Sequence, residues 1–154
     1  MTQLPVPGLP EVPDDRFTWE LPAFEVHEFH PRRTAYSLCV FVINEGARIL
    51  RQLERMQPYM RHVDVILADG GSTDGSMERG RLADAGVRAL VVKRGPGRLS
   101  AQMRIACAFS IDQGYAGVVT MDGNDKDDPA GTPSFIRALE EGWDHVQGSR
   151  FRPG

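Results

Sequence analysis

The sequence predicts an α/β domain whose mostly parallel β-sheet is covered by helices on both faces. Short, almost wholly apolar runs alternate along the chain with segments whose apolar residues recur at helical spacing. A strand of a parallel sheet is buried on both faces, so it reads as a continuous apolar run. The connections between the runs are short, as expected where right-handed crossovers return each helix to the sheet.

Four strands and four helices are expected from residue 36 onward. The strands are the runs 37–43, 63–67, 87–92 and 118–121. The first helix covers 45–56, the second ends near Gly86, the third follows the turn at 95–97, and the last carries Phe135, Ile136 and Leu139. We expect the third helix to bury one face made of Leu99, Met103, Ala106 and Ser110. Residues 145–147 read as the beginning of a further strand.

The chain divides into an N-terminal arm and one domain. Residues 1–35 are expected to form an irregular arm, because the prolines at 5, 7, 10 and 13 remove backbone donors and block helix formation. Residues 36–154 form the expected domain.

The composition is that of a globular protein without a basic face. The 154 residues carry 18 Lys and Arg against 21 Asp and Glu, a formal net charge of −3. Nucleic acid is therefore not an expected partner. The two cysteines do not make a disulfide framework and are expected to be reduced thiols, which is typical of a cytoplasmic protein. No leader segment is visible, and no apolar run approaches the ~20 residues that span a bilayer.

Polar residues and glycines follow each of the four expected strands. These loops begin at Asn44, Asp69, Lys93 and Asp122. Ligands bind outside the carboxyl ends of the strands in open parallel sheets, so we expect the site there. The loop after the first strand lacks the spaced glycines of a dinucleotide fingerprint, and the chain has no P-loop sequence.

The fourth loop offers hard oxygen ligands that suit Mg²⁺ or Mn²⁺. Asp122, Asn124 and Asp125 stand directly after the strand, where a divalent ion would bridge two phosphates. The alternative interpretation is a solvated acidic turn that caps the next helix. On the second loop, the Asp69 carboxylate is a candidate acceptor for a nucleobase or a ribose hydroxyl. The cations available to a diphosphate are Lys93, Arg94, Arg98 and Arg104.

Four motifs in this order resemble family 2 glycosyltransferases, which have the Rossmann-like GT-A nucleotide-diphospho-sugar transferase fold. They are Val-Ile-Asn-Glu at 42–45, Leu-Ala-Asp-Gly-Gly-Ser-Thr-Asp-Gly-Ser at 67–76, Val-Thr-Met-Asp-Gly-Asn at 119–124, and Gln-Gly-Ser-Arg-Phe at 147–151. The last motif is similar to that of the branch that makes polyprenyl-phosphate sugars, the dolichyl-phosphate mannose synthases and their relatives. Three positions depart from the family pattern. Gly70 replaces a second acid, Asn124 replaces the second Asp of the metal motif, and Lys126 stands where relatives often offer another polar metal contact.

The strand-end loops and the resemblance together predict a set of site residues, of which the resemblance implies Glu45, Asp69, Asp122, Asn124 and Arg150. Asp122 and Arg150 are the expected catalytic residues, and Asp122, Asn124 and Asp125 the expected metal ligands. The expected substrate-binding residues are Asn44, Glu45, Asp69, Gly71, Arg98, Arg104 and Arg150. A lipid-phosphate acceptor is already an anion, so catalysis would rest on positioning and charge neutralisation.

The function that the resemblance implies is metal-dependent transfer of a sugar from a nucleoside-diphosphate sugar. A polyprenyl phosphate is one acceptor in that family, which would place the protein at the inner face of the membrane. Relatives continue beyond the point that corresponds to Gly154, so the C-terminal part of the domain is expected to be missing. A non-catalytic nucleotide-sugar-binding module or an inactive fragment therefore stays open as the alternative. A nucleotidyltransferase would need a Gly-rich basic loop after the first strand, which this chain lacks.

Overall fold

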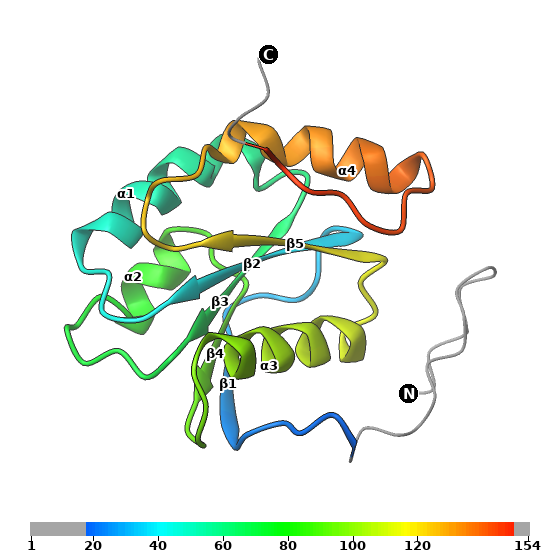
Figure 1. The fold of residues 1–154 in the computed structure, drawn as a ribbon. Helices are drawn as coiled ribbons and strands as arrows, with labels where there is room; N and C mark the ends of the chain where they lie inside the picture. Colours follow the sequence, from blue (N-terminus) through cyan, green and yellow to red (C-terminus); the bar gives the residue numbers. More distant parts are fainter. Residues whose placement is uncertain (1–17, 150–154) are drawn as a thin grey trace.

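The structure, a computed structural model, describes residues 18–149, and these contain one five-stranded sheet with the order β1-β4-β3-β2-β5. Its strands are β1 (Phe24–Glu28), β2 (Tyr36–Val42), β3 (Asp64–Asp69), β4 (Ala89–Lys93) and β5 (Gly117–Asp122). Strands β2 to β5 run parallel to one another, whereas β1 pairs with β4 in the antiparallel sense (Figure 1). The prediction of a mostly parallel sheet is confirmed.

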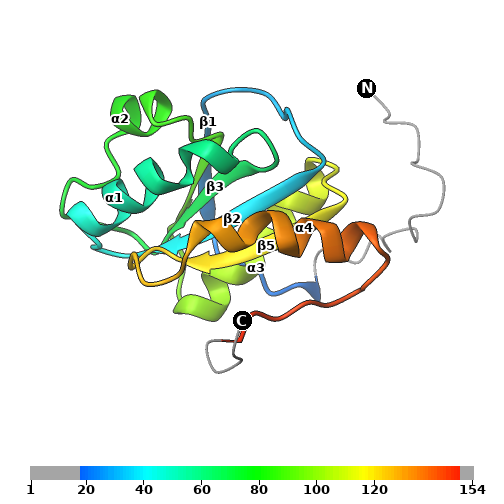
Figure 2. The same ribbon diagram turned by 90° about the horizontal axis from the view of Figure 1, so that it is seen from above.

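Helices cover both faces of this sheet. The helices are α1 (Ala47–Met56), α2 (Arg79–Asp84), α3 (Leu99–Asp112) and α4 (Thr132–Glu140), with short 3₁₀ turns at η2 (Gln57–Tyr59) and η3 (Pro129–Gly131). Figure 2 shows α1, α2 and α4 on one face and α3 on the other. No helix in the described part of the chain is long and apolar enough to span a membrane.

Two separate cores explain the continuous apolar runs. Alternate residues of β2 point to opposite faces, so Leu38, Val40 and Val42 join the core under α1, α2 and α4. Cys39 and Phe41 join the core under α3. Because both faces are covered, β2 has no solvent-facing side chain to interrupt the apolar run.

The prediction of an irregular arm through residue 35 is wrong for residues 24–28. This segment is the edge strand β1, in which Phe24 pairs with Lys93 and Glu28 pairs with Ala89. Backbone hydrogen bonds hold an edge strand, and three of its five residues are exposed. This strand therefore lacks the continuous apolar run that indicates the other four strands in the sequence.

Two smaller predictions are also corrected. Helix α3 buries Ala106 and Ser110 as expected, but Leu99 is 47% exposed and Met103 is 40% exposed. Residues on the neighbouring stripe, including Gln102 and Ile105, face the sheet instead. Residues 145–147 form no strand, because this stretch runs outside the sheet without a pairing partner in the described structure.

Burial should protect Cys39 from thiol reagents. Its side chain is 0% exposed, and burial raises the pKa of the thiol to about 11. At pH 8 the folded chain therefore holds almost no Cys39 thiolate, which is the reactive form. We expect a disulfide exchange reagent to label the part-exposed Cys107 in the native protein and both thiols only after denaturation. Equal native labelling of both cysteines would contradict this packing of β2 against α3.

Candidate active site

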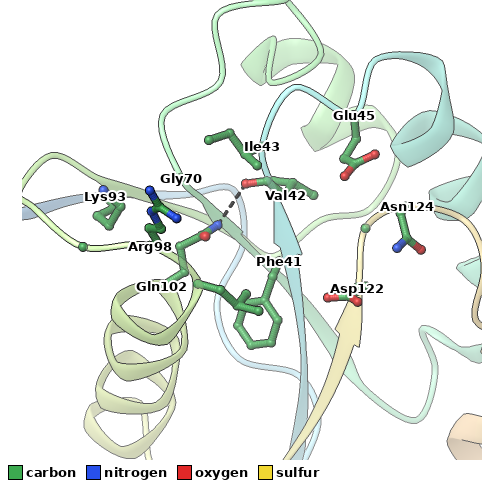
Figure 3. A pocket seen from close by; sticks show the side chains of 13 residues that line it. Phe41, Val42, Ile43, Glu45, Gly70, Lys93, Arg98, Gln102, Asp122 and Asn124 are labelled. Carbon is green, nitrogen blue, oxygen red and sulfur yellow. Dashed lines mark hydrogen bonds between the residues drawn. The ribbon is translucent and has the colours of Figure 1, made fainter.

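A cavity of about 480 Å³ lies at the carboxyl ends of the parallel strands. The chain runs from β2 through β3 to β4 on one side and then returns to place β5 on the other side of β2. The loops after β2 and β5 therefore diverge, and this reversal of strand order is where open α/β sheets bind ligands. The cavity is lined by residues from all four strand ends and by the first turn of α3 (Figure 3).

One side of the cavity carries oxygen ligands. Figure 3 shows Glu45, Asp122 and Asn124 together on this side, at the ends of β2 and β5. Asp122 is exposed at the end of β5, and Asn124 Oδ1 accepts a hydrogen bond from Lys126 N at 3.1 Å. Glu45 lies 3.0 Å from the Arg48 guanidinium in an ion pair.

The opposite side of the cavity is cationic. Lys93 and Arg98 line it at the end of β4 and at the beginning of α3. The Lys93 ammonium donates a hydrogen bond to the Gly95 carbonyl at 2.8 Å, which fixes it at the cavity rim. A ligand in this cavity would meet carboxylate and amide oxygens at one end and positive charge at the other.

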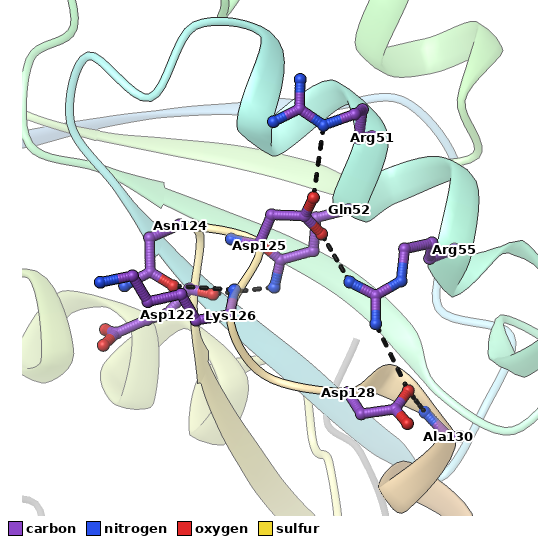
Figure 4. Close-up of polar contacts among 9 residues, drawn as sticks. All are labelled: Arg51, Gln52, Arg55, Asp122, Asn124, Asp125, Lys126, Asp128 and Ala130. Atoms are coloured by element: carbon purple, nitrogen blue, oxygen red, sulfur yellow. Dashed lines mark hydrogen bonds and ion pairs between the residues drawn. The ribbon is translucent and has the colours of Figure 1, made fainter.

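Asp125 faces away from the cavity. Its carboxylate pairs with Arg55 at 2.7 Å and with Arg51 at 3.4 Å, both on α1 (Figure 4). The buried Gln52 fixes this turn, since its Nε2 donates to the Asp122 carbonyl at 2.8 Å and its Oε1 accepts from Asp125 N at 3.0 Å. The structure therefore does not bring the Asp125 carboxylate together with the Asp122 carboxylate and the Asn124 amide. The sequence feature that could have indicated this orientation of Asp125 is the pair Arg51 and Arg55, which lie one helical turn apart on the exposed side of α1.

Hydrogen bonds from polar side chains hold the second loop, which follows β3. Asp69 is 2% exposed, and its carboxylate accepts hydrogen bonds from Ser72 N at 2.9 Å and from Ser72 Oγ at 2.6 Å. Asn44 joins the first loop to the second, because its Oδ1 accepts from Thr73 N at 2.8 Å. Gly71 adopts a φ of +104°, which only glycine adopts without strain. None of these three predicted substrate-binding residues lines the cavity, but they hold the loop whose Gly70 does.

Asp74 adds a second link between the first two loops. Its Oδ2 accepts a hydrogen bond from Gly46 N at 2.9 Å. Hydrogen bonds from Ser76 hold the pKa of the Asp74 carboxyl below its usual range. The carboxylate therefore stays ionised as an acceptor through neutral and mildly acidic pH.

The predicted arginines separate in space. Arg98 lines the cavity, whereas Arg104 lies farther along α3 and donates to the Glu20 carbonyl at 3.2 Å. Arg94 pairs with Glu25 of β1 at 3.0 Å and does not line the cavity. Arg150 lies outside the described residues.

Gln102 is a site residue that the sequence reasoning missed. It is 5% exposed on the first turns of α3 and lines the cavity. Its Nε2 donates to the Val42 carbonyl at 2.9 Å and to the Ala68 carbonyl at 3.0 Å, where β2 and β3 end. The signal in the sequence was a lone amide on the sheet-facing stripe of a helix.

The oxygen-lined side suits a divalent ion that also binds phosphate. No group of three His, Cys, Asp or Glu side chains able to hold a metal occurs within residues 18–149. Mg²⁺ and Mn²⁺ nevertheless bind in nucleotide sites through one or two protein oxygens, with phosphate oxygens and water completing the shell. The Asp122 carboxylate and the Asn124 amide oxygen fit that requirement.

Comparisons with known proteins agree with this fold. No family model matches the chain. Over 94 residues, 59% of this chain, it is 38% identical to the glycosyltransferase AglJ of Haloferax volcanii, and the match spans 29% of that protein. A solved structure, glucosyl-3-phosphoglycerate synthase from Mycobacterium tuberculosis with Mn²⁺, uridine diphosphate and glucosyl-3-phosphoglycerate, superposes with a TM-score of 0.50. The two chains are 24% identical, and the match covers 68% of this chain and 39% of that one.

The fold is the GT-A fold. The prediction of a Rossmann-like GT-A domain is thereby confirmed, and the described residues include the sheet and the strand-end loops of that fold. The chain spans less than two fifths of the length of either protein.

Proposed function

We propose that this chain is the donor-binding part of a metal-dependent family 2 glycosyltransferase, which moves a sugar from a nucleoside-diphosphate sugar to an acceptor. The observation that carries the proposal is the polarised cavity at the strand-order reversal, with Asp122 and Asn124 on one side and Arg98 on the other. The similarity to a glycosyltransferase and to a structure that holds Mn²⁺ and uridine diphosphate supports it.

Different residues of the cavity are proposed to bind the metal ion and the diphosphate of the donor. Asp122 and Asn124 are the proposed ligands of Mg²⁺ or Mn²⁺, and the ion would neutralise the charge of the leaving diphosphate. Arg98 and Lys93 would neutralise the remaining negative charge of the diphosphate from the opposite side of the cavity. Asn44, Asp69 and Gly71 act on the donor through the loop that they hold, and Glu45 faces the cavity directly.

The proposed acceptor is a polyprenyl phosphate at the inner face of the membrane. Its phosphate is already ionised, so the reaction needs no protein base, and Arg150 is the proposed contact of that phosphate. The test compares transfer from the donor to a polyprenyl phosphate with transfer to the matching neutral polyprenol. Transfer to the phosphate alone is expected, and equal transfer to both would overturn this acceptor.

A second candidate is a nucleotide-sugar-binding module without transferase activity. The ion pairs of Asp125 with Arg51 and Arg55 favour it, because they leave Asp122 as the carboxylate of the fourth loop nearest the cavity. Sugar transfer or donor hydrolysis by the purified protein would exclude this candidate.

The test of the proposed function is calorimetric titration with UDP-glucose and GDP-mannose in Mn²⁺, in Mg²⁺ and in excess chelator. Binding of a nucleotide sugar that disappears with chelator is the expected result. Absence of binding to every nucleotide sugar in either metal would overturn the proposal and leave the fold unaffected.

Asp125→Asn should leave metal-dependent nucleotide affinity within about threefold of that of the unsubstituted chain. The reason is that the carboxylate binds α1 and not the cavity, through ion pairs whose arginines are 57% and 45% exposed. Exposed pairs of this kind contribute about 0–1 kcal/mol to stability. Calorimetry and thermal unfolding measure the two effects. A loss of affinity as large as that of an Asp122 variant would show that Asp125 turns inward and ligates the metal.

A further inference from the structure

The Gln102 amide is held in a single orientation at the inner end of the cavity. Its Nε2 donates to the carbonyls of Val42 and Ala68, at 2.9 Å and 3.0 Å. The opposite assignment of the amide would set its oxygen against two carbonyl oxygens, so these two acceptors fix which atom is the nitrogen. Both amide hydrogens are therefore bound to main-chain carbonyl groups.

The Gln102 amide oxygen remains as an acceptor at the cavity. The residue is only 5% exposed, and its Oε1 accepts no hydrogen bond from any residue between 18 and 149. Figure 3 shows this oxygen turned away from Val42, on the side of the cavity that carries Lys93 and Arg98. The oxygen is not among the buried atoms of the described residues that lack a partner, so it is open to the cavity, where a ligand with a matching donor can reach it.

Gly70 provides the space that this arrangement needs. A Cβ at position 70 would lie 3.2 Å from Gln102 Nε2, 3.3 Å from its Cδ and 3.2 Å from Ile43 Cδ1. Those separations are tighter than ordinary van der Waals contact, so a side chain here would displace the amide. Gly70 and Gln102 thus form one unit at the junction of β2 and β3.

We propose that the Gln102 Oε1 accepts the imide N3–H of a uracil, so that the donor of this enzyme is a uridine nucleotide. The inference rests on the proposed function and names the base that the same cavity selects. Gln102 is the specificity-determining residue.

The single acceptor discriminates among the bases. Uracil presents one N–H on its Watson–Crick edge, which matches the single acceptor oxygen of Gln102 at the cavity. Guanine presents two adjacent donors on its Watson–Crick edge and needs two acceptors, but the lining carboxylates Glu45 and Asp122 lie across the cavity (Figure 3). Cytosine and adenine carry a ring acceptor where uracil carries its N–H, and that acceptor would oppose the Gln102 oxygen.

The test is calorimetric titration of the chain in Mn²⁺ with UDP, 3-methyluridine diphosphate, CDP and GDP. The methyl group replaces only the N3 hydrogen. UDP is expected to bind at least ~10-fold more tightly than 3-methyluridine diphosphate, the size of one well-formed hydrogen bond. CDP and GDP are expected to bind more weakly than UDP by a similar factor.

Variants then separate recognition of the base from support of the strand ends. In Gln102→Leu the preference for UDP over the methylated analogue should fall to about twofold or less, since the acceptor is gone. Loosening of β2 and β3 would weaken both ligands equally and leave their ratio unchanged. Gln102→Met repeats the comparison with a side chain of similar length, and circular dichroism checks that each variant is folded. Ser110→Ala, which removes a buried hydroxyl farther along α3, is the control and should keep the unsubstituted ratio.

Each result has a definite meaning. Equal binding of UDP and its methylated analogue by the unsubstituted chain overturns the assignment of Gln102 while the proposed function stands. A preference that persists in both Gln102 variants also overturns it, because bulk at N3 would then explain the ratio. No binding of any nucleoside diphosphate overturns the proposed function and this inference together.

Discussion

Asp122→Ala is expected to abolish metal-dependent nucleotide binding and to leave the fold intact. The Asp122 side chain is exposed at the end of β5 and lines the cavity, so its removal takes nothing from either core. Residues behind metal ligands change affinity by about 10–100-fold when substituted. The loss of a direct carboxylate ligand should reach the upper end of that range or exceed it. Titration with a nucleoside diphosphate in Mn²⁺ and in chelator measures the effect.

A neighbouring acid provides the matched control for this variant. Asp128 belongs to the same loop but pairs with Arg55 at 3.5 Å and caps η3 through Ala130 N (Figure 4). Asp128→Ala should keep Mn²⁺-dependent binding, and both variants should unfold at nearly the temperature of the unsubstituted chain. If Asp122→Ala bound nucleotide in Mn²⁺ as tightly as Asp128→Ala, the metal assignment would be wrong.

The parallel sheet was predictable because a strand that is buried on both faces has a continuous apolar sequence. In β2, every residue from Leu38 to Val42 is apolar, whether it faces α3 or α1, so the strand reads as one run. The loops that begin at Asn44, Asp69 and Asp122 were predictable as a group for a related reason. Parallel strands end at the same edge, and polar residues at several strand ends must then lie near one another.

Side-chain direction within those loops was not predictable from the order of residues. Asp125 stands one position from Asn124, yet a φ of +61° turns it towards Arg51 and Arg55. Asp69 is the last residue of β3, and its carboxylate binds the amide and hydroxyl of Ser72. Both outcomes depend on which donors the fold brings close to the acid. For Asp125 these donors lie on α1, 70 and 74 residues away along the chain, and for Asp69 the turn brings Ser72 back onto the carboxylate.

Gln102 illustrates a different limit of sequence reasoning. A glutamine on a sheet-facing stripe reads as an irregularity in an apolar pattern, and its two partners are backbone carbonyls that every residue carries. Only the positions of the ends of β2 and β3 reveal that both carbonyls converge on one amide. The edge strand β1 was missed for the same reason, because its partners are main-chain groups of β4.

Gly123 lies between Asp122 and Asn124, the two proposed metal ligands, at the point where the fourth loop meets the core. Its amide donates to the Phe41 carbonyl at 2.8 Å, which extends the β2–β5 pairing by one residue beyond Asp122. A Cβ at this position would lie 2.4 Å from Val42 Cγ1 and 2.8 Å from Phe41 O. The requirement for glycine is therefore steric, and it fixes how closely the fourth loop approaches β2.

Gly123→Ala is expected to lower both stability and nucleotide affinity. Overpacking of this kind costs about 1–3 kcal/mol, which corresponds to a fall in melting temperature of roughly 2–4 °C per kcal/mol for a chain of this size. The loop must shift to admit the methyl group, and displacement of Asp122 and Asn124 should weaken metal-dependent nucleotide binding by about tenfold or more. Gly131→Ala is the matched control, because its Cβ would lie 3.7 Å from Phe135 Cε2, an ordinary contact. If the two variants melted and bound nucleotide alike, the close approach of the fourth loop to β2 would not govern the site.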